Sequence, residues 1–172
     1  MHRSNVALIG FMGAGKSTVG RELALRLEKK FVETDTAVER RAGMSVADVF
    51  ERLGEEHFRE LEAAVVREVA LFEDSVIACG GGVVLREDNV AALRATSVLV
   101  YLDVSPESVL LRVGPRSTVR PLLSGPDREQ RVAELMARRR AVYAAAADIT
   151  VATDGLLVEQ VVQAVEERLN QQ

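Results

Sequence analysis

The sequence predicts a three-layer α/β/α fold, in which helices cover both faces of a five-stranded parallel sheet. Five short runs rich in Val, Ile and Leu alternate with longer amphipathic segments, which is typical of buried parallel strands joined by helices. The chain of 172 residues has the size of one domain, and its 48% hydrophobic and 28% charged residues are a globular composition. We therefore expect a single domain over residues 1–172.

The expected elements follow from these runs and from the residues that end them. Gly43 and Gly54 are good stops for two helices, Ser45 can cap the helix between them, and Pro106 suits the first turn of a later one. The expected strands are Asn5–Ile9, 31–34, 75–79, 97–102 and 148–151. The expected helices are 16–28, 35–41, 45–54, 55–72, one from 106 onward, 127–147 and 156–169.

Two segments depart from the regular alternation. Successive helices with no strand between them cover 45–72, which favours a helical substrate-binding insert at about 35–62. Residues 113–126 contain two glycines and three prolines, so they form neither a regular helix nor a central strand. Connections this long are typically functional lids or disordered, so residues 113–126 are a candidate lid.

The first strand runs into GFMGAGKST at residues 10–18, which fits the pattern G-x-x-x-x-G-K-[ST] between a strand and a helix. Its glycines let backbone N–H groups approach a polyphosphate, and the following helix adds its positive N-terminal end. Lys16 can reach the β and γ phosphates, and the Ser17 hydroxyl is a suitable Mg²⁺ ligand. The sequence therefore predicts a P-loop protein that binds a nucleoside triphosphate with Mg²⁺.

Two further groups lie at predicted strand ends, where such a fold places its site. Glu33 and Asp35 are two apart in extended chain and point the same way, toward a metal and an attacking group, unless they only form an acidic surface. Residues 80–82 are three glycines, which let a ligand lie against the backbone or simply form a flexible turn. Cys79 before them is interpreted as a small buried residue and not as a nucleophile.

Arginines provide the remaining candidates. Arg59 and Glu62 are three apart on one helix face, so the carboxylate can orient the guanidinium toward an anion, although a surface ion pair has the same spacing. From Arg112 to Arg140 the chain carries eight arginines against three acidic residues. An arginine on a lid over the γ-phosphate would stabilise charge that develops in phosphoryl transfer.

In order and spacing these blocks resemble the shikimate kinases over essentially the whole chain. The blocks are GFMGAGKST, TD at 34–35, SVADVFERLGEEHFRELE from Ser45, CGGG at 79–82, TVRPLLSGPDR from Thr118, and the arginine ahead of Tyr143. The resemblance implies a P-loop kinase fold like that of nucleoside monophosphate kinases. It also implies transfer of the ATP γ-phosphate to the 3-hydroxyl of shikimate, which gives shikimate 3-phosphate and ADP in aromatic amino acid biosynthesis.

The resemblance also implies roles for individual residues. Lys16, Asp35 and Arg120 would be catalytic, with Asp35 accepting the proton of the attacking hydroxyl. Arg59 and Arg139 would hold the shikimate carboxylate, with the backbone of Gly81 and Gly82 against the ring. Ser17 would ligate Mg²⁺, with Glu33 contacting the metal through water. The residues implied in ATP binding are Gly13, Ala14, Gly15, Lys16, Ser17, Thr18 and Arg120.

Three positions depart from the family pattern. Glu33 stands where the family commonly has aspartate. The usual R-x-P-x-Y has lost its proline in 139–143, where the spacing to Tyr143 favours Arg139 over its arginine neighbours. Residues 152–155 lack the arginine that some members place near adenine, so we expect backbone and apolar contacts to hold the base.

Two alternatives stay open. A kinase of the same fold for a related hydroxy acid, such as aminoshikimate or gluconate, would keep the P-loop and the lid. A nucleotide-binding regulatory module would bind ATP or GTP without transferring phosphate. A GTP switch should carry an NKxD-like motif, which this sequence lacks, and a non-catalytic relic should have lost Lys16, Asp35 or Arg120, which are all present.

Bulk properties limit the partners. The net charge of -4 and the pI near 5.4 disfavour nucleic-acid and membrane-surface binding, and no apolar run approaches 18 residues. The N-terminus is too short for a secretory signal, and the single Cys79 fits a reducing cytoplasm. We expect a cytoplasmic monomer whose partners are ATP and a small acceptor.

Overall fold

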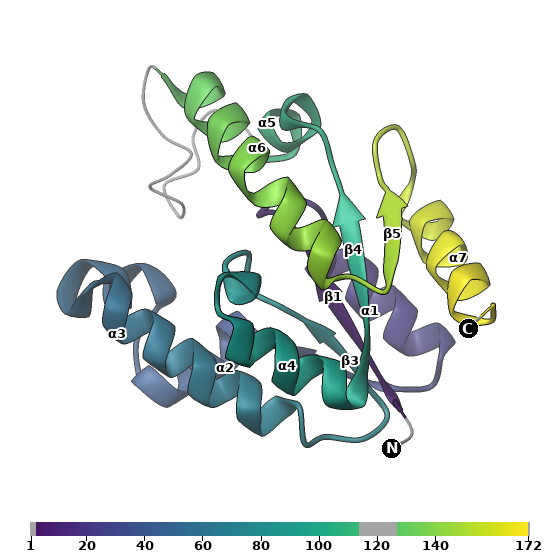
Figure 1. The fold of residues 1–172 in the computed structure, drawn as a ribbon, viewed down its shortest axis with the longest axis horizontal. Coiled ribbons are helices and arrows are strands. Elements are labelled where there is room, and N and C mark those ends of the chain that lie inside the picture. Colours follow the sequence, from purple (N-terminus) through teal and green to yellow (C-terminus); the bar gives the residue numbers. More distant parts are fainter. Residues whose placement is uncertain (1–2, 114–126, 172) are drawn as a thin grey trace.

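A computed structural model describes residues 3–113 and 127–171, and it contains a five-stranded sheet flanked by helices (Figure 1). The strands are β1 (Asn5–Ile9), β2 (Lys30–Glu33), β3 (Ser75–Ala78), β4 (Ser97–Asp103) and β5 (Ile149–Ala152). Their order in the sheet is β2-β3-β1-β4-β5, and every neighbouring pair is parallel. The predicted α/β fold and its five parallel strands are therefore confirmed.

Helices cover both faces of this sheet. α1 packs against α7 on one face, and α3, α4 and α6 lie on the other (Figure 1). The helices are α1 (Lys16–Arg26), α2 (Thr34–Ala42), α3 (Val46–Val69), α4 (Glu87–Thr96), α5 (Pro106–Val113), α6 (Arg128–Ala146) and α7 (Val158–Leu169), with a 3₁₀ turn, η1, at Val83–Leu85.

Strand β1 forms the centre of the core, and all five of its residues are buried. It pairs with β3 on one side and with β4 on the other, so neither of its edges meets solvent. Glu33 at the end of β2 is in register with Ala78 at the end of β3, and Leu8 of β1 is in register with the same Ala78. The segments that follow β1, β2 and β3 therefore emerge side by side at one edge of the sheet.

The insert expected at about 35–62 is helical, as α2 and the first part of α3. The predicted break at Gly54 is a kink inside α3 instead of a full stop, because Gly54 alone adopts non-helical angles there, with φ of 84° and ψ of 168°. Ser45 caps the helix as expected and accepts a hydrogen bond from the Asp48 N–H. The kink brings the rings of Phe50 and Phe58 together, with 4.5 Å between their centroids.

The sequence predicted no element for residues 83–96, and the lid that it predicted lies outside the described residues. Residues 83–96 form η1 and α4, a helix that buries Leu93 together with a polar residue, Asn89. The Asn89 amide N–H donates to the Val83 carbonyl, while its Oδ1 has no hydrogen-bond partner among the described residues. A polar residue in the buried face weakens the helical pattern of the sequence. The expected lid at about 113–126 lies outside the described residues except for Val113, and so does Arg120.

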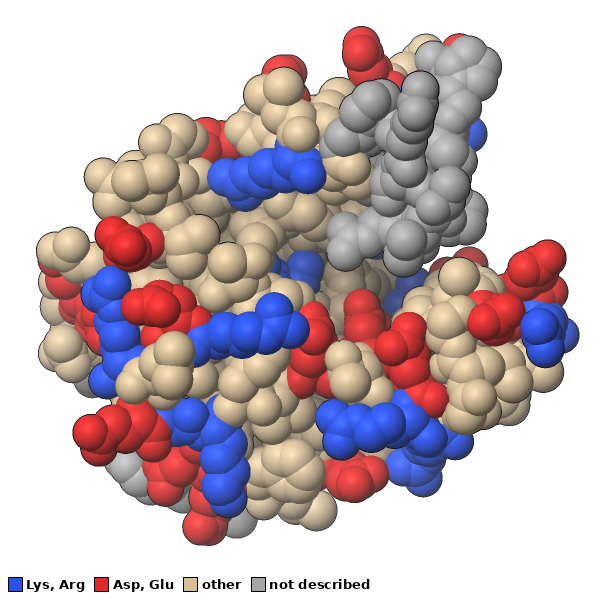
Figure 2. Space-filling view, turned by 180° about the vertical axis from the view of Figure 1, so that it is seen from behind, with Lys and Arg blue, Asp and Glu red and all other residues tan. Residues whose placement is uncertain are grey.

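The surface carries both signs of charge. In the view from behind, lysines and arginines alternate with acidic side chains and do not gather into one basic area (Figure 2). Among the helices that the structure describes, none has the length and apolar character needed to cross a membrane.

Gly54 offers a test of the kink, with Gly43 as a matched control. Both have positive φ, and at neither would an added Cβ meet another atom within 4 Å, so Gly→Ala changes only the backbone cost. Gly43 is in the left-handed helical region, at φ 69° and ψ 16°, which alanine adopts at a cost of about 1 kcal/mol. The angles of Gly54 are almost restricted to glycine, and we expect Gly54→Ala to lower the free energy of unfolding by about 2–3 kcal/mol. Urea denaturation of both variants measures this, and equal losses would contradict it.

Candidate active site

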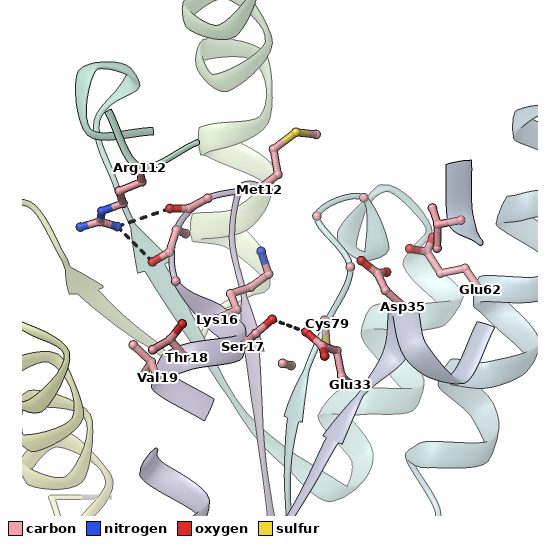
Figure 3. A pocket seen from close by; sticks show the side chains of 18 of the residues that line it. Met12, Lys16, Ser17, Thr18, Val19, Glu33, Asp35, Glu62, Cys79 and Arg112 are labelled. Carbon is pink, nitrogen blue, oxygen red and sulfur yellow. Dashed lines mark hydrogen bonds between the residues drawn. The ribbon is translucent and has the colours of Figure 1, made fainter. Parts of the chain in front are cut away.

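A cleft of about 980 Å³ opens at the edge of the sheet where β1, β2 and β3 end (Figure 3). This volume is at the upper end of the range for small-molecule sites. It is lined by every sequence-predicted site residue that the structure describes: Gly13, Ala14, Gly15, Lys16, Ser17, Thr18, Glu33, Asp35, Arg59, Gly81, Gly82 and Arg139. The tertiary structure thus brings together residues from five separate segments of the chain.

The P-loop connects β1 to the start of α1. Gly15 is the N-cap of α1 in a left-handed conformation, with φ of 94°, which an L-residue would adopt only under strain. The Lys16 ammonium group donates to the carbonyls of Gly10 and Phe11, each at 2.8 Å, so it lies over its own loop. The first N–H groups of α1 and this ammonium group make the loop end of the cleft positive.

Glu33 and Ser17 meet at the cleft wall between α1 and β2 (Figure 3). The Ser17 hydroxyl donates to one oxygen of the Glu33 carboxylate. Arg21 at 3.4 Å and the Thr36 hydroxyl at 3.3 Å contact the other oxygen. Hydroxyl and carboxylate oxygens are hard donors of the kind that Mg²⁺ prefers, so this pair fits a magnesium site that phosphate oxygens would complete.

The extended arrangement assumed for Glu33 and Asp35 was wrong, although the helix expected from residue 35 is present as α2. Asp35 does not continue an extended strand beside Glu33, because α2 begins at Thr34 and Asp35 lies in its first turn. It nevertheless lines the same cleft as Glu33. A Cβ at Gly80 would lie only 2.6 Å from the Asp35 Oδ1, so the carboxylate rests directly on the glycine segment 80–82.

Arg59 and Glu62 form a partly buried ion pair beside Asp35. Their atoms are 2.8 Å apart, and the Glu62 side chain is only 1% exposed. Burial raises the pKa of Glu62, although the hydrogen bond and the charge of Arg59 act to lower it. Burial also works to lower the pKa of Arg59, but its hydrogen bonds and charge interactions with Glu62 and Glu55 leave that pKa raised. Among the described residues, Glu62 Oε1 has no hydrogen-bond partner.

Helix α6 carries three consecutive arginines with different environments. Arg139 is half-buried and lines the cleft. Arg138 is exposed, and Arg140 pairs with Asp103 at 2.7 Å. One turn beyond Arg139, the buried Tyr143 donates a hydrogen bond to the Gly81 carbonyl. From the sequence, Tyr143 was used only to identify Arg139, four residues before it, and was given no role of its own.

Arg112 is a site residue to which the sequence assigned no individual role. From α5 its guanidinium donates to the P-loop carbonyls of Gly13 at 3.5 Å and Ala14 at 3.3 Å (Figure 3). It also donates to the carbonyl of Thr153 after β5, at 3.0 Å. Arg112 therefore ties the phosphate loop to the segment expected to hold adenine. In the sequence, Arg112 stood out only as one of the eight arginines between residues 112 and 140.

The position of Cys79 in the structure agrees with its interpretation as a small buried residue. It is 3% exposed, and burial raises the pKa of its thiol to about 12. A thiol with so high a pKa is almost entirely protonated at neutral pH and is a poor nucleophile.

Comparisons with known proteins agree with this site. The model of the family described as shikimate kinase matches residues 12–170. The shikimate kinase of Symbiobacterium thermophilum is 47% identical over 97% of both chains, and that of Moorella thermoacetica is 48% identical over 96% of this chain and 94% of its own. The structure of shikimate kinase from Acinetobacter baumannii in complex with shikimate superposes with a TM-score of 0.93, at 33% identity over 98% of this chain and 93% of that one. The chain therefore belongs to the shikimate kinase family.

Proposed function

We propose that the protein transfers the γ-phosphate of ATP to the 3-hydroxyl of shikimate and releases shikimate 3-phosphate and ADP. One observation carries the proposal. A single cleft joins a P-loop to an acceptor wall that presents the carboxylate of Asp35 and the guanidinium groups of Arg59 and Arg139. A nucleotide half and a half suited to a hydroxylated carboxylic acid are what this transfer requires. The family membership of the chain supports the same reaction.

The donor half comprises the loop and the start of α1. Residues 13–18 bind the phosphates through backbone N–H groups, and Lys16 exchanges its loop carbonyls for the β and γ phosphates. Arg120, from outside the described residues, contributes a cation over the γ-phosphate. The cations lower the energy of the transition state by stabilising its spreading negative charge.

Mg²⁺ would be held by Ser17 and Glu33 together with phosphate oxygens. The described residues contain no cluster of three or more His, Cys, Asp or Glu that would form an all-protein metal site. This suits Mg²⁺, which commonly binds nucleotide sites through one or two protein oxygens. When bound, it neutralises part of the phosphate charge. Glu33 has one methylene more than the usual aspartate, and its carboxylate reaches the Ser17 hydroxyl directly.

The acceptor half comprises Asp35, the segment 80–82 and the two arginines. Asp35 accepts the proton of the attacking hydroxyl. Arg59, which Glu62 orients at 2.8 Å, and Arg139 grip the carboxylate. The backbone of Gly81 and Gly82 lies against the ring. The substrate-binding insert is residues 35–62, and the whole chain acts as one domain and as a cytoplasmic monomer.

The first test is the choice of acceptor in a coupled ADP-release assay with Mg-ATP. We expect turnover with shikimate to exceed that with aminoshikimate, gluconate or a nucleoside monophosphate by at least about 100-fold in kcat/KM, because the site's polar groups stay unpaired with a poor match. Equal ADP release without any acceptor would contradict the proposal and indicate ATP hydrolysis, and ATP binding with no ADP release from any acceptor would favour a nucleotide-binding module. Preference for another acid would reassign the substrate.

The second test separates the two halves at Arg59. Losing a charge-assisted hydrogen bond of about 2–3 kcal/mol should raise the KM for shikimate about 30- to 150-fold in Arg59→Ala, with the KM for ATP changed less than about threefold. Arg59→Lys keeps a charge beside the buried Glu62 but loses the fork, so it should show the same split without unfolding. Arg52→Ala, at a residue 68% exposed in the same helix, is the control. An equal rise in the KM for shikimate and the KM for ATP would contradict the assignment of Arg59 to the shikimate carboxylate.

The third test concerns Glu33. Glu33→Gln keeps the shape of the side chain but removes its charge, so Mg²⁺ should be bound more weakly. We expect the Mg²⁺ concentration for half-maximal activity, and for half-maximal thermal stabilisation by Mg-ADP, to rise about fivefold, which corresponds to about 1 kcal/mol. Glu22→Gln, at a half-buried residue of α1 that pairs with Arg26, should leave both midpoints unchanged. An unaltered Mg²⁺ dependence in Glu33→Gln would remove Glu33 from the metal site.

A further inference from the structure

The side chain of Tyr143 ends at the acceptor wall of the cleft. Tyr143 is 1% exposed and lies on α6, four residues after Arg139, so both side chains lie on the same face of the helix. Its hydroxyl donates a hydrogen bond to the Gly81 carbonyl. A buried hydroxyl with such a contact needs a reason, because an apolar phenyl ring of nearly equal size would fill the same space without a polar group to satisfy.

The surroundings of this hydroxyl are the groups proposed to hold the acceptor. Burial raises the pKa of Tyr143, while the charge and hydrogen bond of Arg139 and the charge of Arg59 oppose that rise and Glu62 adds to it. A tyrosine hydroxyl is protonated at neutral pH even at its ordinary pKa, and the raised pKa acts in the same direction. Tyr143 therefore remains a donor to Gly81 while Arg139 lies beside its oxygen.

Fixing the Gly81 carbonyl also fixes the next N–H group. The peptide unit is planar, so the Gly81 C=O and the Gly82 N–H point in opposite directions within one rigid plane. At the other end of the block, the Gly80 N–H donates to the hydroxyl of the fully buried Thr34 at 2.8 Å. Three successive glycines have no side chains of their own to restrict them, so their hydrogen bonds define their orientation. The Val83 and Leu85 N–H groups donate to the Gly80 and Gly82 carbonyls, and Tyr143 holds the Gly81 carbonyl between them.

We propose that Tyr143 is a positioning residue that aligns both the Gly81–Gly82 peptide and the Arg139 guanidinium for the acceptor. This inference rests on the proposed function only for the identity of the acceptor. Tyr143 touches neither reacting atom. It acts through the backbone and through the arginine, and its removal should weaken the acceptor half while leaving the donor half intact.

Tyr101 on β4 provides a matched control within the same protein. Its ring stacks on that of Tyr143, with centroids 5.2 Å apart and an angle of 19° between the planes. Its hydroxyl donates instead to Asp103 at 2.8 Å, which pairs with Arg140. Tyr101 does not line the cleft. Tyr101→Phe and Tyr143→Phe thus each remove one partly buried hydroxyl from one aromatic pair, and only the second removes a contact to the glycine block.

The experiment compares these two variants with the wild type in two measurements. In steady-state kinetics, Tyr143→Phe should raise the KM for shikimate about 5- to 20-fold and change the KM for ATP less than about twofold, since one buried carbonyl loses its partner. Tyr101→Phe should change neither by more than about twofold. In the ligand-free protein, the ¹⁵N–¹H resonance of Gly82 should shift in Tyr143→Phe and not in Tyr101→Phe.

The outcomes separate this inference from the proposed function. Identical kinetics and identical Gly82 resonances for the two variants would overturn the positioning role, as would equal rises in both KM values with a lowered thermal midpoint in Tyr143→Phe. A wild-type enzyme that does not phosphorylate shikimate would overturn the proposed function. If the Gly82 resonance still moved only in Tyr143→Phe, the alignment of the peptide by Tyr143 would stand for whichever acceptor the enzyme uses.

Discussion

The absence of side chains at residues 80–82 is the constraint on which both halves of the cleft depend. An added Cβ at Gly82 would lie 2.2 Å from the Arg59 Nη1 atom, and one at Gly80 would lie 2.9 Å from Glu62 Oε1. On the other side, a Cβ at Gly81 would come within 3.4 Å of the backbone nitrogen of Met12 in the P-loop. The glycine block therefore lies between the P-loop and the side chains of Asp35, Arg59 and Glu62, and a side chain at 80 or 82 would collide with those groups.

The acceptor wall contains charges that would be costly elsewhere. Glu62 is almost wholly buried, and its pairing with Arg59 offsets only part of the cost of removing a carboxylate from water, as its raised pKa indicates. One of its oxygens has no partner within the described part of the chain. Local violations of this kind are typical of functional sites, where orientation is more important than stability. Here the buried carboxylate of Glu62 fixes the position of the partly buried Arg59 guanidinium at the cleft.

The donor side is connected differently, through side chains that join separate loops. Arg112 binds carbonyls of the P-loop and of Thr153, and Asp154 next to it accepts hydrogen bonds from Ser105 at the start of α5. Glu33 links β2 to Ser17 and Arg21 of α1. These contacts join different elements to one another around the P-loop.

By itself, the sequence determined the α/β alternation, the P-loop, and the residues that line the cleft, because strand runs, glycine patterns and the spacing of Lys16, Asp35 and Arg59 are local. It expected the helix from Asp35 but also treated 33–35 as extended chain, whereas the helix already starts at Thr34. It also missed α4, whose buried face includes a polar residue. The spacing to Tyr143 already favoured Arg139, and the structure places it at the cleft. Only the tertiary structure decided that Arg140 pairs with Asp103, that Arg112 binds P-loop carbonyls, and that Tyr143 donates to Gly81. These choices depend on which groups from distant segments lie within hydrogen-bonding distance, and that follows from the order of the strands in the sheet and not from any local pattern.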